Sequence, residues 1–380
     1  MTNSVRIVLF LVACVSCIVP ICLWAGETAE ARDYKLKVEV LTEGLNHPWS
    51  MAFLPDGRML ITERPGRLRL LSDDYHLVPA SVENLPDIEA KGQGGLLDVV
   101  LHPDYKNNAW LYLSYVAEGR NGLGVEVVRA KLVDHRLEKV DPIFRARPKS
   151  SGGRHFGSRL VFDQQQYLYI TLGERGDKER AQRLDDHAGS VVRLHDDGRI
   201  PVDNPFPEQK QVAKGLFSYG HRNPQGMAFD PVTNQLWVHE HGPQGGDELN
   251  LLTGGKNYGW PVITYGVNYV FGTKIGEGHA KAGMMQPIHY WVPTSIAPSG
   301  MAIYRGSVFK KWRGDIFLGA LRGQMLVRLK IKENKVVTEE HLLKNQLGRI
   351  RDVRVGPDGL LYLLIDARNG KLVRLSPLTE

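Results

Sequence analysis

Six times along this chain, an apolar run, a tight turn and a second apolar run follow one another. The clearest copies lie at residues 49–62 and 352–365, and each has Pro-Asp-Gly between its two runs. Asp-Gly between apolar runs is a strong signal for a β-hairpin. The remaining copies occupy residues 96–115, 159–172, 226–239 and 300–327. Setting aside the first 25 of 380 residues, each copy corresponds to about 59 residues, enough for four short strands and their loops.

This repetition predicts an all-β fold. Regular short strands with Gly, Pro and Asp in their turns are typical of a β-sandwich, a β-barrel or a β-propeller. Because the hairpin recurs six times, we expect a six-bladed β-propeller with four-stranded antiparallel blades around a central channel. Hairpins also recur in other large all-β proteins, so a sandwich or barrel is the competing interpretation. A propeller is one closed unit, and residues 32–380 are therefore expected to form a single catalytic domain. We expect the functional site at one end of the channel, where loops converge.

The N-terminus is expected to be a secretory signal peptide, residues 1–25. Arg6 precedes the uncharged, mainly apolar run at residues 7–25, and small residues follow it. These are the features of such a signal. Cleavage is expected at the end of this run or as late as Ala31, where the sequence reads Ala-Glu-Ala. We therefore expect a periplasmic protein; the competing interpretations are an uncleaved membrane anchor and a lipoprotein signal at Cys14.

Composition excludes several classes of function. The three cysteines, Cys14, Cys17 and Cys22, all lie in the N-terminal segment, so no disulfide framework or cysteine-ligated metal is expected in the rest of the chain. The net charge of +6 is scattered, without a block of like charges. Nucleic acid is accordingly not expected as a partner.

A histidine in a glycine-rich loop is the first candidate for chemistry. His155 lies in residues 151–157, just before a predicted strand, and Glu174 and Asp177 follow the next strand. Histidine suits general-base catalysis because its pKa is ordinarily close to neutral pH. Either carboxylate would orient it. A single loop histidine is more often an ordinary surface residue, so this pattern alone is weak.

Two further patterns indicate ligands. Residues 241–248 combine carboxylates with glycine-rich backbone, and calcium prefers such oxygen ligands, although the spacing is not that of an EF-hand. A turn without metal is the alternative. Arginines mark the ends of other repeats, and several on one rim would suit a planar polyanion. Ordinary solvent-exposed charge is the competing interpretation for each; these arginines are Arg222, Arg322, Arg349 and Arg351.

Seven stretches, in order, resemble the soluble pyrroloquinoline quinone (PQQ) sugar dehydrogenases, the glucose/sorbosone dehydrogenase family, and especially its periplasmic aldose sugar dehydrogenases. They are Gly-Leu-Asn-His-Pro-Trp (44–49), Gly-Gln-Gly-Gly-Leu-Leu-Asp (92–98), His-Phe-Gly-Ser-Arg-Leu (155–160), Gly-His-Arg-Asn-Pro-Gln-Gly (220–226), Glu-His-Gly-Pro (240–243), Asp-Glu-Leu-Asn (247–250) and Gly-Lys-Asn-Tyr-Gly-Trp-Pro (255–261). The fold of this family is a six-bladed propeller, in agreement with the repeats.

The resemblance implies roles for individual residues. His155 matches the catalytic base, and Glu174 matches an acid beside it. The positions that match PQQ contacts are Gln93, Arg222, Asn223, Tyr269, the run Ala320, Leu321, Arg322 and the run Arg349, Ile350, Arg351. The carbonyls of Gly242 and Pro243 match ligands of the calcium under PQQ, and Glu248 and Tyr258 match a second, structural calcium site. Some members place a lysine against the quinone where this chain has Arg322.

The implied activity is oxidation of the C1 hydroxyl of aldose sugars to lactones, with hydride transfer to calcium-bound PQQ. Without a C-x-x-C-H haem motif, electrons are expected to leave to a separate quinone or cytochrome acceptor. A monomer or weak dimer is expected. Two other classes of function compete with this one, namely a calcium-dependent lactonase propeller and a non-catalytic binding propeller.

Overall fold

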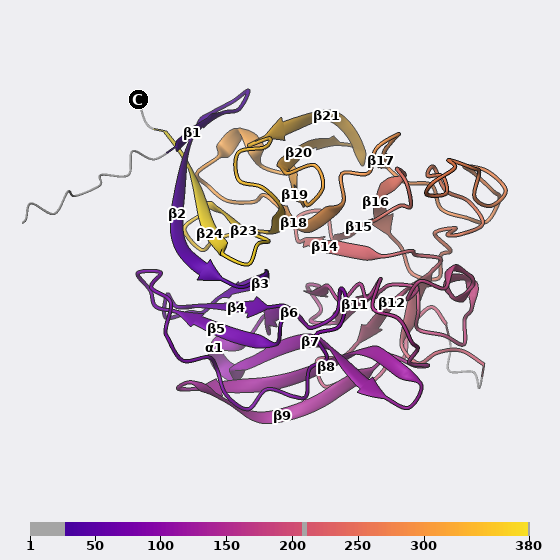
Figure 1. Cartoon of the computed structure of the whole chain (residues 1–380), viewed down its shortest axis with the longest axis horizontal. Coiled ribbons are helices and arrows are strands. Elements are labelled where there is room, and N and C mark those ends of the chain that lie inside the picture. Colours follow the sequence, from indigo (N-terminus) through magenta and orange to yellow (C-terminus); the bar gives the residue numbers. More distant parts are fainter. Residues whose placement is uncertain (1–26, 207–210, 379–380) are drawn as a thin grey trace, which may run out of the picture.

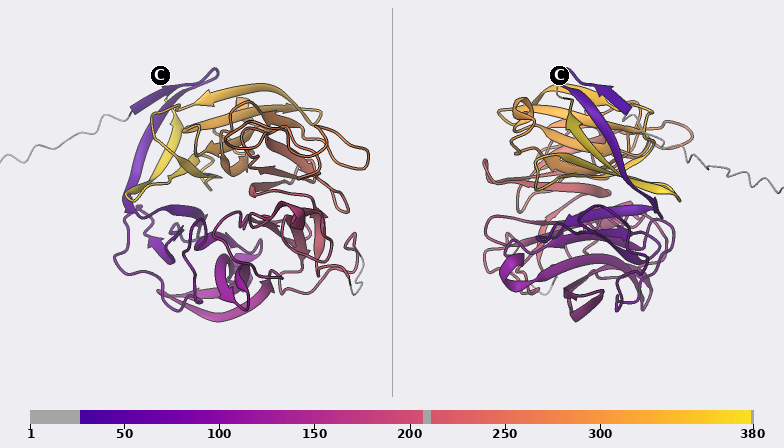
Figure 2. Two further views of the ribbon diagram at one scale, coloured as in Figure 1. Left: turned by 45° about the vertical axis from the view of Figure 1, so that its right-hand side comes forward. Right: turned by 90° about the vertical axis from the view of Figure 1, so that its left-hand side faces the viewer.

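The computed structural model describes residues 27–206 and 211–378, and it confirms the six-bladed β-propeller. Six antiparallel sheets stand around a common axis (Figure 1), and we number them as blades 1 to 6. Figure 2 shows the ring from two further directions. The predicted signal peptide, residues 1–25, lies outside the described residues.

The strands of each blade follow one another along the chain. Blade 1 contains β3 (Pro48–Phe53), β4 (Met59–Glu63) and β5 (Arg67–Leu71). Blade 2 contains β6 (Leu96–Leu101), β7 (Trp110–Gly119), β8 (Gly122–Val133) and β9 (Arg136–Arg145). Blade 3 contains β10 (Leu160–Phe162), β11 (Leu168–Leu172), β12 (Ser190–Leu194) and β13 (Leu216–Tyr219).

The second half of the ring is built in the same way. Blade 4 contains β14 (Pro224–Asp230), β15 (Gln235–Glu240), β16 (Asp247–Leu252) and β17 (His289–Trp291). Blade 5 contains β18 (Pro298–Ile303), β19 (Ile316–Ala320), β20 (Met325–Lys332) and β21 (Lys335–Leu342). Blade 6 contains β22 (Ile350–Val355), β23 (Leu361–Ile365) and β24 (Gly370–Pro377), joined by β2 (Lys35–Leu45) and β1 (Glu27–Glu30).

Blade 6 closes the ring because β2, near the start of the described chain, pairs with the last strand, β24. Its order β1-β2-β24-β23-β22 makes it five-stranded, whereas blade 1 has three strands. In blade 1, the irregular segment after β5 takes the place of a fourth strand. Val78 and Val82 donate their N–H groups to the carbonyls of Leu70 and Leu68, and Val82 is buried.

The six predicted hairpins form the first two strands of the six blades, as the pairing of β3 with β4 and of β22 with β23 illustrates. Among the described residues, helices are confined to α1 (Tyr105–Asn108) and two short 3-10 turns, Lys178–Gln182 and Lys310–Trp312. In the part of the chain that the structure describes, no helix is long and apolar enough to cross a membrane.

The hydrophobic core is divided among the blade interfaces. Six buried clusters join neighbouring blades, and the cluster between blades 2 and 3 also includes Trp49 of blade 1. Between blades 5 and 6, for example, Phe309 and Trp312 stack at 4.5 Å and pack with Leu361. Burial of apolar surface in these interfaces therefore holds the ring together.

Charged side chains fill the middle of the channel. The Arg159 guanidinium lies 3.1 Å from Asp98 and 3.2 Å from Asp352, and Arg354 contacts both carboxylates at 3.0 Å. The Arg159 guanidinium also lies 4.3 Å from the centre of the Trp49 ring. Since Asp98, Asp352 and Arg159 are buried, mutual pairing offsets the cost of burying their charges. Trp49 lines the cavity described next.

Candidate active site

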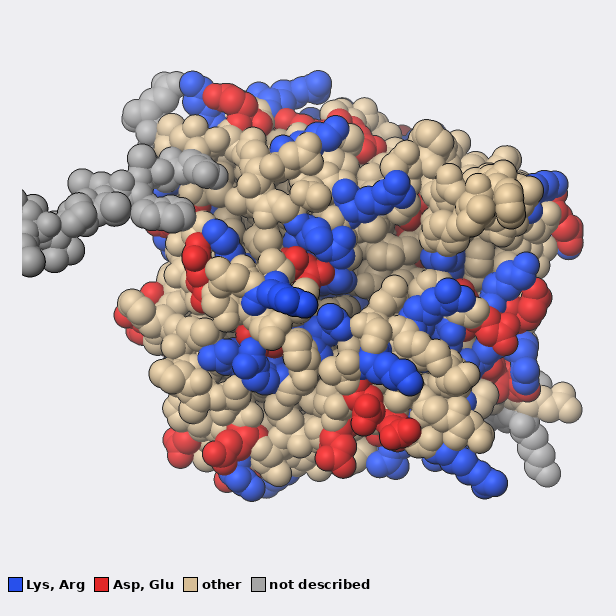
Figure 3. Space-filling view, viewed as in Figure 1, with Lys and Arg blue, Asp and Glu red and all other residues tan. Residues whose placement is uncertain are grey.

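A polar cavity of 490 Å³ is built from equivalent positions in successive blades. Its residues lie mostly just before a first strand or just after a second strand, so one end of the ring supplies them. Figure 3 shows Lys and Arg side chains around a hollow near the middle of one face. The residues that line the cavity are His47, Trp49, Arg64, Gly92, Gln93, Leu97, Phe156, Gly157, Asn223, Gln225, His241, Ala297, Leu321, Arg349, Arg351 and Asp366.

His155 adjoins Phe156 and Gly157 of this lining and is paired with Glu174. Its Nδ1 lies 2.6 Å from Glu174 Oε2, which also accepts the N–H of Gly176 at 2.6 Å. The backbone N–H of His155 donates to the Gln93 side chain at 2.8 Å. The side chains of His155 and Glu174 are both largely buried. Of the two predicted carboxylates, the structure therefore brings Glu174 to the histidine, while Asp177 is exposed.

The electrostatics of the pair determine which atom can act. Burial lowers the pKa of His155, and Arg222 and Arg154 lower it further, against the opposing effect of Glu174. Burial alone would raise the pKa of Glu174, but the hydrogen bond from His155 brings it below its usual value. Near neutral pH the carboxylate is thus charged and accepts the Nδ1 proton. Nε2 is left unprotonated and free to accept a proton.

Amide side chains join this pair to blade 4. The Asn223 Oδ1 accepts the N–H of Gly157 at 3.2 Å and the Gln225 side-chain N–H at 3.3 Å. Gln93, predicted on the same grounds as Asn223, also lines the cavity. Gln225 was not predicted, although it lies two residues after Asn223 at the start of β14.

Arg222 lies between the cavity and the loop that was predicted to bind calcium. Its Nη1 donates to the carbonyls of His241 at 3.1 Å and Gly242 at 2.7 Å. Its Nε is buried without a hydrogen-bond partner among the described residues. The Gly242 carbonyl, predicted as a calcium ligand, therefore accepts a hydrogen bond from this guanidinium.

Three of the predicted calcium residues share a small cavity of 10 Å³. Gly242, Glu248 and Tyr258 line it together with Arg222 and Glu240. Burial raises the pKa of Glu248 to about 8, and the nearby charge of Glu240 adds to the effect. Pro243 does not line this cavity. The described residues contain no group of three His, Cys, Asp or Glu side chains placed to hold a metal.

Arg349 and Arg351 meet a carboxylate that the sequence did not single out. The Asp366 Oδ2 lies 3.2 Å from Arg351 Nη2 and 3.4 Å from Arg349 Nη2. Its Oδ1 lies 2.8 Å from His47 Nδ1. Burial would raise the pKa of Asp366, but Arg351, His47 and Arg349 lower it. Asp366 therefore holds both arginines and His47 at the cavity wall.

The remaining predicted cofactor residues differ in their positions. Leu321 lines the cavity, whereas Ala320 and Ile350 are buried in blade interfaces. Arg322 is exposed and outside the lining. Tyr269 is 59% exposed in a loop and likewise outside the lining. The structure therefore does not bring Tyr269, Arg322 or the Ile350 side chain to this cavity.

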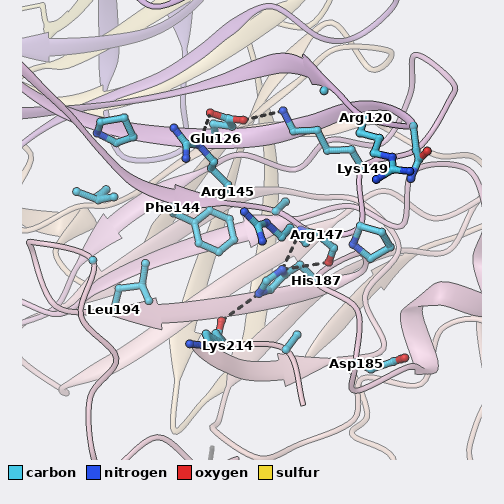
Figure 4. Close-up of a pocket in the computed structure, with 18 of the residues that line it drawn as sticks. Arg120, Glu126, Phe144, Arg145, Arg147, Lys149, Asp185, His187, Leu194 and Lys214 are labelled. Atoms are coloured by element: carbon cyan, nitrogen blue, oxygen red, sulfur yellow. Dashed lines mark hydrogen bonds and ion pairs between the residues drawn. The ribbon is translucent and has the colours of Figure 1, made fainter. Parts of the chain in front are cut away.

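A larger groove of 1080 Å³ lies away from this chemistry, between blades 2 and 3 (Figure 4). Basic, acidic and apolar residues line it, Phe144 among them, and none of the predicted site residues is included. The buried His187 ring stands in its wall, with both ring nitrogens within hydrogen-bond distance of the backbone of Arg147 and Lys214. Volume alone would favour this groove. The His155–Glu174 pair instead places the candidate chemistry at the 490 Å³ cavity, which we call the axial cavity.

The fold and the site define a class of protein, a six-bladed propeller with a histidine–carboxylate pair beside an arginine-lined axial cavity. Residues 45–374 match the family model of glucose/sorbosone dehydrogenases. The chain is 46% identical over 361 residues to the aldose sugar dehydrogenase YliI of Escherichia coli, covering 93% of this chain and 95% of that protein. The chain belongs to the glucose/sorbosone dehydrogenase family.

Two solved structures of aldose sugar dehydrogenases have the same fold as this chain. The apo-form of the soluble aldose sugar dehydrogenase of Escherichia coli superposes with a TM-score of 0.87 at 46% identity, over 90% of this chain and 100% of that one. The PQQ-bound form of the aldose sugar dehydrogenase of Streptomyces coelicolor gives a TM-score of 0.74 at 27% identity, over 91% and 99%.

Proposed function

We propose that this protein is a periplasmic quinoprotein that oxidises the C1 hydroxyl of aldoses to lactones, with calcium-bound PQQ as hydride acceptor. The observation that carries the proposal is the buried His155–Glu174 pair beside an arginine-lined cavity. The names of the relatives supply the substrate class, and the PQQ-bound relative supplies the cofactor.

The residues of the cavity fit PQQ, a planar quinone with three carboxylates. Arg64, Arg349 and Arg351 supply cations, which bind carboxylates through paired N–H groups. Gln93 and Asn223 supply amide groups beside the histidine. The unpartnered Nε of Arg222 is a further buried donor that a bound anion would satisfy.

Calcium also fits the chemistry of the donors. Carboxylate and carbonyl oxygens are its preferred ligands, and Gly242, Pro243, Glu248 and Tyr258 offer these groups. The half-buried Glu248 beside Glu240 carries a raised pKa, and a divalent cation would remove the repulsion between the two carboxylates. We therefore propose Gly242 and Pro243 as ligands of the calcium under PQQ, and Glu248 and Tyr258 as ligands of a second, structural calcium.

The side chains of this chain divide the work of the reaction. The neutral His155 Nε2 takes the proton of the C1 hydroxyl, and Glu174 stabilises the imidazolium that forms. The C1–H bond breaks with both of its electrons, and the C1–O bond becomes the carbonyl of the lactone. PQQ, when bound, supplies the acceptor for that hydride. Arginines around the cavity stabilise negative charge as it develops.

Reconstitution tests this proposal. The purified protein, stripped with chelator, is assayed for dye reduction with several aldoses before and after adding PQQ and calcium. We expect activity only with both additions, and a rate about 10²–10⁴-fold lower in His155→Gln. Full activity without PQQ would refute the cofactor assignment, and lactone hydrolysis without PQQ would indicate a lactonase. Binding of aldoses without turnover in any of these conditions would indicate a binding propeller.

The cellular setting forms part of the proposal. Export would follow from a signal peptide at residues 1–25, and electrons would pass to a separate quinone or cytochrome. β1 begins at Glu27, so cleavage after Ala25 retains this strand, whereas cleavage after Ala31 removes it. Mass spectrometry of the mature protein distinguishes the two cleavage sites. Sedimentation of the same sample tests the proposed monomer or weak dimer.

A further inference from the structure

A second polar cavity adjoins the loop that carries His155. Its volume is 650 Å³, and residues 150–154, residues 175–177 and Arg180 line it. Arg154 immediately precedes His155, and the N–H of Gly176 donates to Glu174. This second cavity therefore touches the backbone on both sides of the catalytic pair.

A backbone contact joins its wall to the wall of the axial cavity. Gln93 N–H donates to the Gly153 carbonyl at 2.7 Å, and a Cβ on Gly92 would lie 2.2 Å from the same oxygen. Gly92 and Gln93 line the axial cavity, whereas Gly153 lines the second one. A group bound in the second cavity would consequently lie close to a sugar at His155.

The charge of this second cavity is unbalanced. Its three cations are Arg154, Arg175 and Arg180, and its one carboxylate is the exposed Asp177. Arg180 is neutralised, because Asp186 accepts two of its hydrogen bonds at 2.8 and 2.9 Å. Among the described residues of this region, His155 pairs with Glu174 and Arg180 pairs with Asp186, whereas neither Arg154 nor Arg175 forms an ion pair.

Arg175 is a buried cation in this wall. It is 8% exposed, and its guanidinium lies 3.5 Å from the centre of the Phe156 ring. Its two terminal nitrogens donate to the carbonyls of Arg154 and Gly152, but its Nε is buried without a described partner. Burial, together with Arg180, lowers the pKa of Arg175 to about 10, so it remains charged at neutral pH. A nearby anion would offset the cost of burying that charge.

We propose that this second cavity binds an acidic group of the substrate, and that the preferred substrates are aldoses carrying a carboxylate or a phosphate on a carbon other than C1. The proposal rests on the proposed function, which places C1 at His155. The exposed guanidinium of Arg154 would contact the acidic group directly, and the buried Arg175 would add attraction without moving. A neutral sugar gains neither contact.

Steady-state kinetics of the reconstituted protein test the proposal. The kcat/KM values are measured for glucose, glucuronate and glucose 6-phosphate. We expect at least one of the acidic sugars to exceed glucose by about tenfold, the usual order for a charge-assisted contact. Preference for glucuronate assigns the site to carboxylates, and preference for glucose 6-phosphate assigns it to phosphates. If glucose equals or exceeds both, the proposal is wrong.

Two variants, one that removes a positive charge and one that removes a negative charge, test the role of the second cavity more directly. Arg154→Gln is expected to remove the preference for the acidic sugar, and Asp177→Asn to increase it about twofold to fivefold, because the one lining carboxylate is gone. Arg120→Gln is the matched control, since Arg120 is an exposed arginine in the separate groove of Figure 4. An equal loss of preference in Arg120→Gln would show a general charge effect and overturn the site.

Binding to the protein without PQQ separates this inference from the proposed function. Glucuronate and glucose 6-phosphate are titrated calorimetrically into wild type and Arg154→Gln at low and high salt. We expect an Arg154-dependent affinity for one of them that weakens as salt screens the charges. If aldoses are not oxidised but this binding occurs, the proposed function fails and the acidic-group site stands. If aldoses are oxidised and neither acidic sugar binds, only the site is refuted.

Discussion

Replacing Glu174 with glutamine isolates the charge of the carboxylate from its geometry. The Oε2 of Glu174 accepts two hydrogen bonds of 2.6 Å, from His155 Nδ1 and from the N–H of Gly176. A glutamine carbonyl in the same place can accept both, because both partners are donors. The Nδ1 proton and the ring orientation are therefore retained, and only the negative charge is lost.

The size of the effect follows from that difference. A hydrogen bond to a charged group contributes about 1.5–3 kcal/mol, against about 0.5–1.5 kcal/mol between neutral groups. The variant thus loses about 1–1.5 kcal/mol of stabilisation of the imidazolium that forms during the reaction. We expect kcat at the pH plateau to fall about tenfold.

The pH dependence gives a second, independent readout. His155 must be neutral to accept a proton, so the rate rises with pH through its pKa. Burial already lowers that pKa in the wild type, and Glu174 opposes the shift. Without the carboxylate, the pKa falls further, and the rising limb of kcat against pH moves to lower pH. A limb that moves to higher pH, or an unchanged plateau, would refute the reasoning.

Four further outcomes are expected. His155→Gln should lower kcat about 10²–10⁴-fold while calorimetric PQQ affinity stays the same, and near-normal turnover would contradict a general-base role. Arg222→Ala should weaken PQQ binding by about 1.5–3 kcal/mol, because it deletes a charged donor whose Nε has no described protein partner; an unchanged Kd would remove Arg222 from the cofactor site. For Glu248, a folded pKa of about 8 lies above its ordinary 4.5, so the folded state binds the proton more tightly and stability in chelator falls as pH rises between these values. Thermal melts should therefore show this fall in wild type but not in Glu248→Gln, and calcium should raise the wild-type midpoint most at the upper end of the range; equal pH profiles would contradict it. Asp366→Asn should strengthen binding of the anionic PQQ and increase its sensitivity to salt, because both cavity arginines lose the carboxylate that neutralises them; unchanged affinity would restrict Asp366 to a structural role.

The fold was predictable because its signals are local. In the first copy, Gly57 adopts a φ of +91°, which favours glycine, and Asp56 accepts the N–H of Arg58, so residue chemistry fixes the turn between two apolar strands. Strand number was less predictable. The backbone of Val78 and Val82 replaces a fourth strand in blade 1 through hydrogen bonds that follow no alternating pattern.

The site was predictable in part. His155 and Glu174 follow the glycine-rich motif and the next strand, and the structure joins them as expected. His47 and Asp366 were missed because they lie more than 300 residues apart and meet only when the ring closes. The repeat could have indicated Asp366. It directly follows the second strand of blade 6, just as His241 directly follows the second strand of blade 4.

Tyr269 shows a limit of matching residues to a family. A residue-by-residue match cannot report where a long loop places its side chain, and this one is exposed outside the cavity. Ile350 shows another limit. It starts a strand between two cavity arginines, and the alternation of side chains along β22 turns it into the core while Arg349 and Arg351 face the cavity.

Ring closure ties the folding of this chain to its axial cavity. Leu36 pairs with Pro377, and Arg349, Arg351 and Asp366 all belong to the blade that this pairing completes. Contacts between residues so far apart in sequence are slow to form, because a long loop must close first. The axial cavity is therefore complete only when this blade has formed. A circular permutant would join β2 to β24 covalently and open the ring between two other blades. The rate at which such a permutant binds PQQ during refolding would differ from that of the natural chain, so PQQ binding would report on the closure of the ring.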